Sequence, residues 1–202
     1  MRESQDSSNK PEWLGYPPLP SPILPSREEF DSKEWIIQPK RRGWRIVICN
    51  GQAYTKQGEA INLPKAFLSF RNVQLDGEII SWKRPETEHQ MEDTIRNSRY
   101  SIALFDIYST SLEDAPLYLD DERTLSYNTT VMSRYAQLRE IYRNCYDIVY
   151  SYKVQSYSDI FRKTERFVQE GCEGAILKKK CGVYKVSEHS QIIDPDWIKI
   201  EP

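Results

Sequence analysis

Metal-ligating residues are scarce in this sequence of 202 residues. It has two histidines, His89 and His189, and its four cysteines are scattered with no Cys-x-x-Cys pair. Structural zinc sites need several closely spaced cysteine or histidine ligands, so this composition argues against a zinc site. Reduced thiols, most of them buried, are expected at Cys49, Cys145, Cys172 and Cys181.

Long apolar runs and a positive net charge are missing as well. No apolar run approaches the roughly 20 residues needed to span a bilayer, and the polar start MRESQDSSNK lacks the apolar core of a secretory signal. Lysine and arginine number 28 against 30 aspartate and glutamate residues, so any contact with a polynucleotide has to be local. We therefore expect a soluble intracellular protein, cytoplasmic or nucleoid-associated, with no membrane partner.

Proline is concentrated at the N-terminus, where residues 1–27 hold half of the 12 prolines. Proline lacks an N–H and has a fixed φ angle, so this segment is expected to be extended or polyproline-like and to form neither a sheet ladder nor a helix. It is either a ligand for an aromatic groove in a partner or a tail that lies on its own domain through Trp13, Tyr16 and Leu19. The predicted organisation is a Pro-rich tail, 1–27, and one domain, 28–202.

The remainder of the chain mixes strand and helix patterns. Two segments have the apolar spacing of amphipathic helices, TTVMSRYAQLREIYRNC at 129–145 and YSDIFRKTERFVQEG at 157–171. Strands clustered before and after a pair of helices predict an α+β domain with antiparallel sheets. The predicted strands, which are rich in β-branched and aromatic residues, are 35–38, 44–50, 78–82, 100–107, 148–152, 174–178 and 197–200.

Three consecutive cations, Lys40, Arg41 and Arg42, interrupt the strand-forming stretch IIQPKRRGWRIVI. By itself such a stretch is typical of a solvated hairpin turn. Other turn-to-strand junctions, which are rigid places for a site, also carry charged or aromatic residues. These residues are Glu78 in LDGEII, Phe105 in IALFDIY, Glu173 in EGCEGAILKKK and Lys199 in DPDWIKIEP.

The order of these segments resembles the covalent nucleotidyltransferase superfamily of ATP-dependent DNA ligases, RNA ligases and mRNA-capping guanylyltransferases, and it is most similar to the DNA ligases. QPKRRGWR resembles the motif Lys-x-Asp-Gly-x-Arg, with Lys40 as the nucleophile and Arg45 as the trailing arginine. YTKQG at 54–58 is similar to the Ser/Thr-Arg-x-Gly element, with Lys56 at the arginine position. The later motifs are matched in order by LDGEII, FDIY, DERTLSY, EGCEGAILKKK and WIKIEP.

This resemblance implies a ligase-type, ATP-grasp-like nucleotidyltransferase domain with antiparallel β-sheets flanked by helices. It also implies ATP as substrate, Mg²⁺ as the metal, and a Lys40–AMP intermediate. Lysine attacks phosphate only as the neutral amine, which neighbouring cations favour, and Arg41, Arg42 and Lys199 are the expected neighbours. The implied roles are nucleotide binding for Arg45, Glu78 (ribose), Phe105 (base) and Lys199 (α-phosphate), metal binding for Glu173, and nucleic-acid contact for Arg45 and Lys56.

Three features differ from the family pattern. Arg42 stands where the lysine motif has aspartate, and Glu201 stands where the last motif has a second lysine. The sequence also stops at Pro202, before the OB-fold domain of the family. We therefore expect no OB-fold domain, and a separate OB-fold or other protein as a partner that completes the site.

Two classes of function are compatible with these residues. The first is an ATP-dependent ligase that forms lysine–AMP and seals nicks in DNA during repair, replication or recombination; RNA ligation and GTP-dependent capping are alternatives within this class. The second is a nucleotide-binding accessory module that does not ligate. Lys40, Glu78, Glu173 and Lys199 favour the enzyme, since a pocket without chemistry has little need for its nucleophile. Nicked DNA is the expected partner, with RNA as the alternative.

Overall fold

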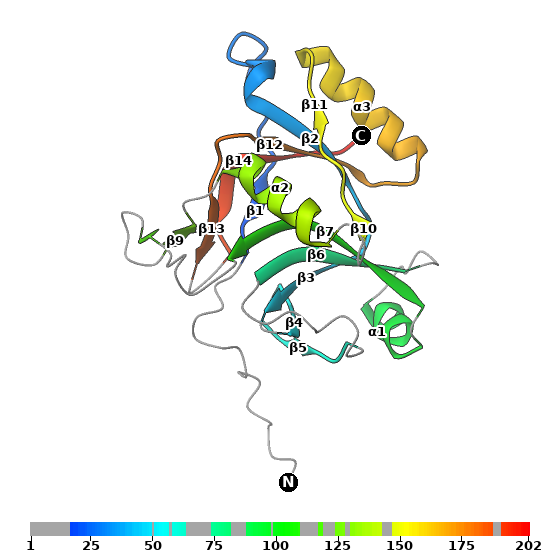
Figure 1. Ribbon diagram of the computed structural model, residues 1–202. Coiled ribbons are helices and arrows are strands. Elements are labelled where there is room, and N and C mark those ends of the chain that lie inside the picture. The colour runs from blue at the N-terminus through cyan, green and yellow to red at the C-terminus, as the bar shows by residue number, and fades with distance from the viewer. Residues whose placement is uncertain are drawn as a thin grey trace.

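The computed structural model describes residues 17–49, 51–56, 58–63, 74–81, 88–97, 99–109, 117–118, 124–127, 130–142, 147–187 and 191–202. Their strands form two larger sheets, which occupy the upper and lower parts of Figure 1, and one small sheet. The described architecture is α+β, as the sequence predicted.

The five-stranded sheet has the order β1-β14-β12-β2-β11. Its strands are β1 (Leu19–Ser21), β2 (Trp35–Lys40), β11 (Tyr152–Lys153), β12 (Gly174–Lys179) and β14 (Ile193–Ile200). A short 3-10 helix, η1 (Ser32–Glu34), precedes β2. Strand β12 lies at the centre, because it pairs antiparallel with both β2 and β14.

The six-stranded sheet has the order β10-β7-β6-β3-β4-β5. Its strands are β3 (Trp44–Cys49), β4 (Gln52–Thr55), β5 (Ala60–Ile61), β6 (Gln74–Ser81), β7 (Tyr100–Ser109) and β10 (Asp147–Ile148). The small sheet contains β8 (Leu117–Tyr118), β9 (Thr124–Tyr127) and β13 (Tyr184–Ser187). Two pairs, β1 with β14 and β10 with β7, are parallel, so the larger sheets are mixed and not purely antiparallel as predicted.

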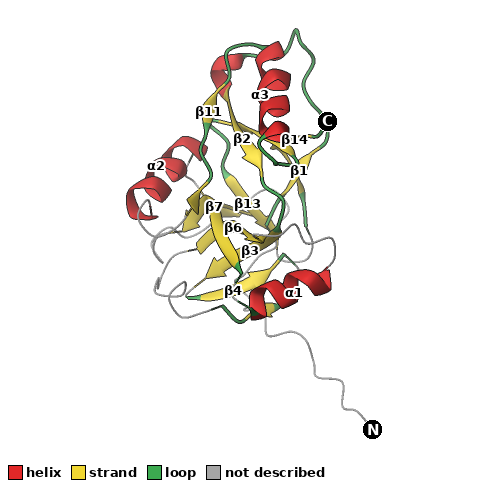
Figure 2. Cartoon of the chain, turned by 90° about the vertical axis from the view of Figure 1, so that its right-hand side faces the viewer, coloured by secondary structure: helices red, strands yellow, loops and turns green. Residues whose placement is uncertain are grey.

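Among the described residues, three α-helices flank the sheets: α1 (Glu88–Arg96), α2 (Val131–Tyr142) and α3 (Tyr157–Gln169). Figure 2 shows α3 against the five-stranded sheet and α1 beside the six-stranded one. Ser156 caps α3, because its hydroxyl accepts a hydrogen bond from the Asp159 N–H at 3.2 Å. The chain leaves this helix through Gly171, whose φ of 91° favours glycine. The sequence predicted α2 and α3 but not α1.

Alternate residues of β3 pack into two different cores. Ile46 and Ile48 belong to a core that also holds Leu138 of α2. Val47 belongs to a second core with Trp197 of β14. Because successive side chains of a strand point to opposite faces, the residues on the Val47 face of β3 point towards the five-stranded sheet.

Two sequence predictions about strands are wrong. The predicted strand 148–152 is two short strands, β10 and β11, which belong to different sheets. The Pro-rich segment does form a ladder, because β1 pairs with β14 and the Leu19 N–H donates to the Ile192 carbonyl at 2.7 Å. Strand β1 lies at the edge of its sheet, where the missing N–H of Pro20 costs least. Residues 1–16 lie outside the described part, and the division at residue 27 remains a prediction.

The thiol predictions hold in part. Cys49 and Cys172 are buried thiols, whereas Cys181 is an exposed one and Cys145 lies outside the described residues. No helix in the described part of the chain is long and apolar enough to cross a membrane.

Candidate active site

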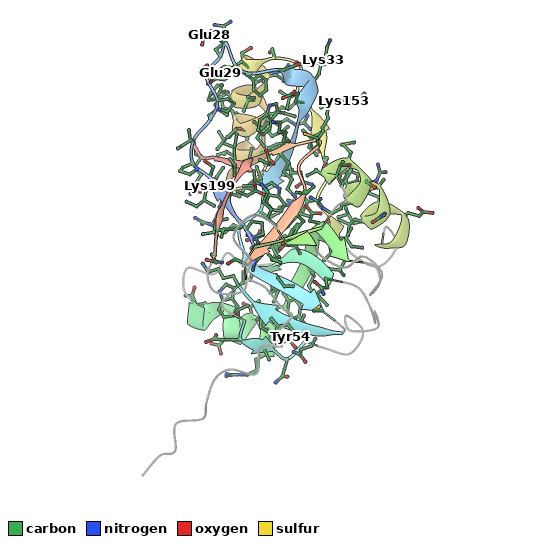
Figure 3. The ribbon with its side chains drawn as sticks, turned by 90° about the vertical axis from the view of Figure 1, so that its left-hand side faces the viewer. Glu28, Glu29, Lys33, Tyr54, Lys153 and Lys199 are labelled. Carbon is green, nitrogen blue, oxygen red and sulfur yellow. The ribbon has the colours of Figure 1, made fainter. Side chains whose placement is uncertain are left out.

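A cavity of about 450 Å³ opens between the two larger sheets. Such a volume suits a small-molecule ligand. The cavity is lined by all seven predicted site residues: Lys40, Arg45, Lys56, Glu78, Phe105, Glu173 and Lys199. These come from both sheets, and Figure 3 labels one residue of each sheet, the lining residue Lys199 on β14 and Tyr54 on β4.

The register of the five-stranded sheet gathers residues that are far apart in sequence. On β12, Gly174 pairs with Lys40, and Ile176 pairs with Lys199 of β14. Alternate side chains of a strand share a face, so three strands build one wall of the cavity together. This wall contains Gln38 and Lys40 of β2, Ile176 and Lys178 of β12, and Trp197 and Lys199 of β14.

Lys40 is the last residue of β2, and its ammonium group contacts two carboxylates. One is Glu173, whose own N–H donates to the Lys40 carbonyl at 2.9 Å. The other is Glu201, with Oε1 3.5 Å from Lys40 Nζ. The sequence predicted cations as the neighbours of Lys40; instead Arg42 pairs with Glu173 at 3.2 Å and Lys199 pairs with Glu201 at 3.1 Å.

Arg45 is held by the protein on every side of its guanidinium group. Nε and Nη2 bind the Asp76 carboxylate at 3.0 and 2.6 Å, and Nη1 donates to the Pro18 carbonyl at 2.5 Å. The group also lies 5.6 Å from the ring centre of Phe105 and 5.8 Å from that of Trp197. Burial disfavours its charge, but Asp76 outweighs burial and raises the pKa of Arg45 above its usual value. All three nitrogens already donate hydrogen bonds within the protein, so Arg45 has a structural role in the cavity wall.

Glu78 lies opposite Arg45 in the pairing of β3 with β6. Burial raises the pKa of Glu78 to about 7, although Lys40 and Arg45 partly offset this effect. Gly43 makes this arrangement possible, because a Cβ atom there would collide with the Ile79 carbonyl and lie 2.8 Å from Glu78 Cγ. The glycine of the KRRG turn therefore allows the lysine segment to approach β6 closely.

A β-bulge on β7 places Phe105 in the cavity wall. Asp76 pairs with Asp106 and Gly77 with Leu104, so Phe105 is the extra residue of the bulge. Lys178 bridges the bulge from β12, because its Nζ lies 3.3 Å from the Phe105 carbonyl and 3.2 Å from Asp106 Oδ2.

A buried charge cluster supports this bulge. Arg134 of α2 is fully buried and binds Asp106 at 2.7 Å. Burial alone would raise the pKa of Asp106, but Arg134 and Lys178 hold it below its usual value. Burial also lowers the pKa of Lys178, whose Nζ lies 3.8 Å from the ring centre of Trp197.

Sequence reasoning missed Lys178 and Trp197 as lining residues. Strand alternation would have found Trp197, which is two residues before Lys199, whereas Lys178 shares its face of β12 with Ile176 and not with a predicted site residue of that strand. Of the DERTLSY segment, residues 124–127 form β9 and residues 121–123 lie outside the described part.

The charge of the cavity wall favours an anionic ligand. Among the described lining residues, two are carboxyl groups, Glu78 and Glu173, and six are cations: Lys40, Arg41, Arg45, Lys56, Lys178 and Lys199. A concave site with this excess of cations attracts phosphates. Phe105, half-buried at the same site, offers an aromatic face to a base. The arrangement suits a nucleotide whose phosphates point towards Lys40.

Solved structures of DNA ligases share this fold. A Lig E DNA ligase superposes with a TM-score of 0.67 and 16% identity over 94% of this chain and 69% of that one. The ligase domain of M. tuberculosis LigD gives 0.62 and 17%, over 92% and 59% of the two chains. The ATP-dependent DNA ligase of bacteriophage T7, in complex with ATP, gives 0.61 and 15%, over 93% and 68%.

Sequence comparison identifies the family. Curated proteins give no match to this chain. The family model described as "ATP dependent DNA ligase domain", however, matches residues 26–200, which include every predicted site residue. Since this match covers most of the chain, the protein belongs to the family of ATP-dependent DNA ligase domains, whose fold is that of a nucleotidyltransferase.

Proposed function

We propose that this chain acts as the nucleotidyltransferase of an ATP-dependent DNA ligase, with Lys40 as the residue that carries AMP. The observation that carries the proposal is the convergence of Lys40, Glu78, Phe105, Glu173 and Lys199 on one cavity between two sheets. A lysine amine, an aromatic face and two carboxyl groups in one cationic cavity are the groups needed to hold and attack a nucleoside triphosphate.

In the first step the neutral Lys40 amine attacks the α-phosphate of ATP. The N–P bond forms, the bond from the α-phosphate to the bridging oxygen breaks, and pyrophosphate leaves. The nitrogen must lose a proton, and Glu173, which contacts Lys40 Nζ, is positioned to accept it. We assign stacking on the base to Phe105, contact with the ribose to Glu78 and contact with the α-phosphate to Lys199.

In the later steps AMP passes from Lys40 to a 5′-phosphate at a nick in DNA, so the N–P bond breaks and the amine regains its proton. The 3′-hydroxyl then attacks the 5′-phosphate, the phosphodiester bond forms and AMP leaves. Sealing of nicks would serve DNA repair, replication and recombination. Lys56, exposed at the cavity rim, is assigned to contact with the DNA backbone. We do not assign Arg45 to nucleic acid, because its nitrogens already bind Asp76 and Pro18 and its side chain is only 15% exposed.

The residues at the cavity also fit Mg²⁺. This ion keeps several waters and binds through one or two carboxylates together with substrate phosphates. Glu173, which lines the cavity, offers such a carboxylate, and the described residues contain no cluster of three or more acidic, cysteine or histidine side chains that would form a cage. Bound there, Mg²⁺ would neutralise charge on the leaving pyrophosphate.

Labelling with ATP that carries radioactive phosphorus at the α-position tests this function. The protein should keep the label through denaturing electrophoresis, whereas Lys40→Arg should lose it, because arginine stays charged and supplies no neutral nucleophile. Lys153→Arg, an exposed lysine on β11, is the matched control and should be labelled normally. Equal labelling of Lys40→Arg would refute the assignment. Labelling by GTP alone would move the protein to the capping enzymes.

The accessory-module alternative is favoured by one observation, the ion pairs of Glu201 with Lys40 and Lys199. A single-turnover assay on nicked DNA and on nicked RNA separates the two functions. Sealing of DNA supports the ligase, and sealing of RNA alone points to an RNA ligase. If Lys40 takes up AMP but neither nick is sealed, the accessory module replaces the ligase.

A further inference from the structure

We propose that Glu201 sets the affinity of the cavity for phosphates, because it occupies the two amines that a nucleotide needs and has to be displaced when the nucleotide binds. This inference rests on the proposed function and adds a competing carboxylate that contacts two lysines of the same site. Glu201 stands where the family pattern has a lysine, so the effect is a property of this sequence.

The contacts of Glu201 carry the inference. Its Oε1 lies 3.5 Å from Lys40 Nζ and its Oε2 lies 3.1 Å from Lys199 Nζ. One carboxylate thus bridges two amines from β2 and β14, which are separated by β12. Hydrogen bonding to Lys199 lowers the pKa of Glu201, so this group is ionised at neutral pH.

Two of the other four cations of the cavity are already paired with buried carboxylates. Lys178 is buried against Asp106, and Arg45 is buried against Asp76. The side chains of Lys40 and Lys199 are 23% and 35% exposed, so solvent and ligands can reach them. A phosphate that binds both amines would share their positive charge with the Glu201 carboxylate. Two anions then compete for the same cations and repel each other.

Glu201 is suited to being displaced. It follows the last residue of β14, and 46% of its side chain is exposed. Ion pairs at such exposed positions are individually weak, so phosphates can break them at low cost. The competition should grow with the number of phosphates and should vanish for a nucleoside, because adenosine carries no charge.

The test measures binding to the full chain of an ATP analogue with a methylene group between the α- and β-phosphates, which cannot transfer AMP. Isothermal titration compares wild type, Glu201→Gln, Glu201→Lys and the control Glu165→Gln, which alters an exposed residue of α3. We expect Glu201→Gln to bind the analogue about three- to tenfold more tightly, as the loss of two weak competing ion pairs implies. Glu201→Lys should bind more tightly still, and Glu165→Gln should match wild type.

The same titrations with AMP and adenosine separate competition from a change in folding. The increase in affinity of the Glu201 variants over wild type should be smaller for AMP than for the analogue and should be absent for adenosine. It should also decrease as salt is added. An equal gain for adenosine, or wild-type affinity for the analogue in both Glu201 variants, would overturn the proposal.

The titrations and the labelling experiment together distinguish a failure of the Glu201 role from a failure of the ligase assignment. If Lys40 is labelled by ATP and the Glu201 variants bind the analogue like wild type, only the role of Glu201 fails. If the Glu201 variants gain affinity for the analogue but Lys40 is never labelled, the proposed lysine–AMP chemistry is refuted. The proposal that Glu201 competes with phosphates is then still supported. If the wild type and all variants fail to bind the analogue, both are refuted.

Discussion

Asp76 is a fully buried carboxylate whose charge is balanced locally. Arg45 binds it through two nitrogens, and the Tyr184 hydroxyl donates to its Oδ2. A buried charge of this kind is tolerated only while its partners remain, because the low-dielectric interior penalises an unpaired ion. The arginine that the motif contributes is thus bound to the strand that carries Glu78.

Arg45→Met should therefore lower the free energy of unfolding by about 3–5 kcal/mol, since it leaves the buried Asp76 carboxylate without its arginine partner. Urea unfolding measures this change. The double variant Arg45→Met/Asp76→Asn should recover part of the loss. Arg96→Met, which breaks an exposed pair with Asp93, should change stability by less than about 1 kcal/mol. A loss of the same size in both arginine variants would contradict the role of burial.

Glu78 should make stability depend on pH. Its pKa is about 7 in the folded protein, against an ordinary value of 4.5, so the folded state binds the proton more tightly. The resulting stabilisation is complete below about pH 4.5 and is lost as the pH rises through about 7, by at most about 3 kcal/mol. Unfolding of Glu78→Gln, measured from pH 5 to pH 8, should lack this decline. A parallel pH profile for wild type and variant would refute it.

At the level of elements, α3 shows how one helix divides its residues between core and solvent. Phe167 is 2% exposed and packs with the core of the five-stranded sheet, whereas Phe161 on the same helix is 44% exposed. Both have the same side chain and helical backbone, so they differ mainly in burial.

Phe167→Ala should consequently cost about 3–5 kcal/mol of unfolding free energy, the usual range for a truncated core phenylalanine. Phe161→Ala should cost less than about 1 kcal/mol, because its ring stays largely in water and contacts chiefly Tyr157. Thermal or urea unfolding of the two variants makes the comparison. Similar losses would mean that the outer face of α3 is also part of the folding core.

The sequence predicted those elements whose pattern is local. The apolar spacing of α2 and α3 and the β-branched runs of β2, β3, β7, β12 and β14 are visible in short windows of sequence. Strand β1 was missed because its prolines argue against a ladder, and only its edge position explains the exception. The predicted strand 148–152 is interrupted because its two ends pair with different sheets, and no local pattern in the sequence reveals this pairing.

The site was predictable as a set of residues but not as a set of contacts. Motif order identified all seven lining residues that were proposed. The family resemblance assigned Arg45 to nucleotide and nucleic-acid binding, but its pairing with Asp76 depends on the register of β3 with β6. In the same way, the bulge at Phe105 and the bridge from Lys178 follow from strand pairing across the fold.

For the whole molecule, the cavity between the sheets links ligand binding to folding. A nucleotide that touches Lys199 on one sheet and Glu78 on the other would bind only when both sheets are in place. At 100 times its Kd such a ligand adds about 2.7 kcal/mol of stability, which corresponds to a rise in Tm of roughly 5–11 °C for a chain of this size.

Thermal unfolding with the methylene-bridged analogue tests this linkage, and hydrogen exchange locates it. Protection should increase on β12 and β6, one strand from each sheet, and should remain unchanged on α1, which contributes no residue to the described cavity wall. Increased protection confined to a single sheet would contradict binding between them.

The anchoring of β1 has a practical consequence for protein production. The family match begins at residue 26, so a recombinant version cut at that boundary would lose Leu19 and Pro20 from the cavity wall and the Pro18 carbonyl from Arg45. It would also expose the outer edge of β14 as an unpaired strand, which invites aggregation. A version that begins before Pro17 keeps this edge covered, so the choice of start codon decides whether the nucleotide site is assayed intact.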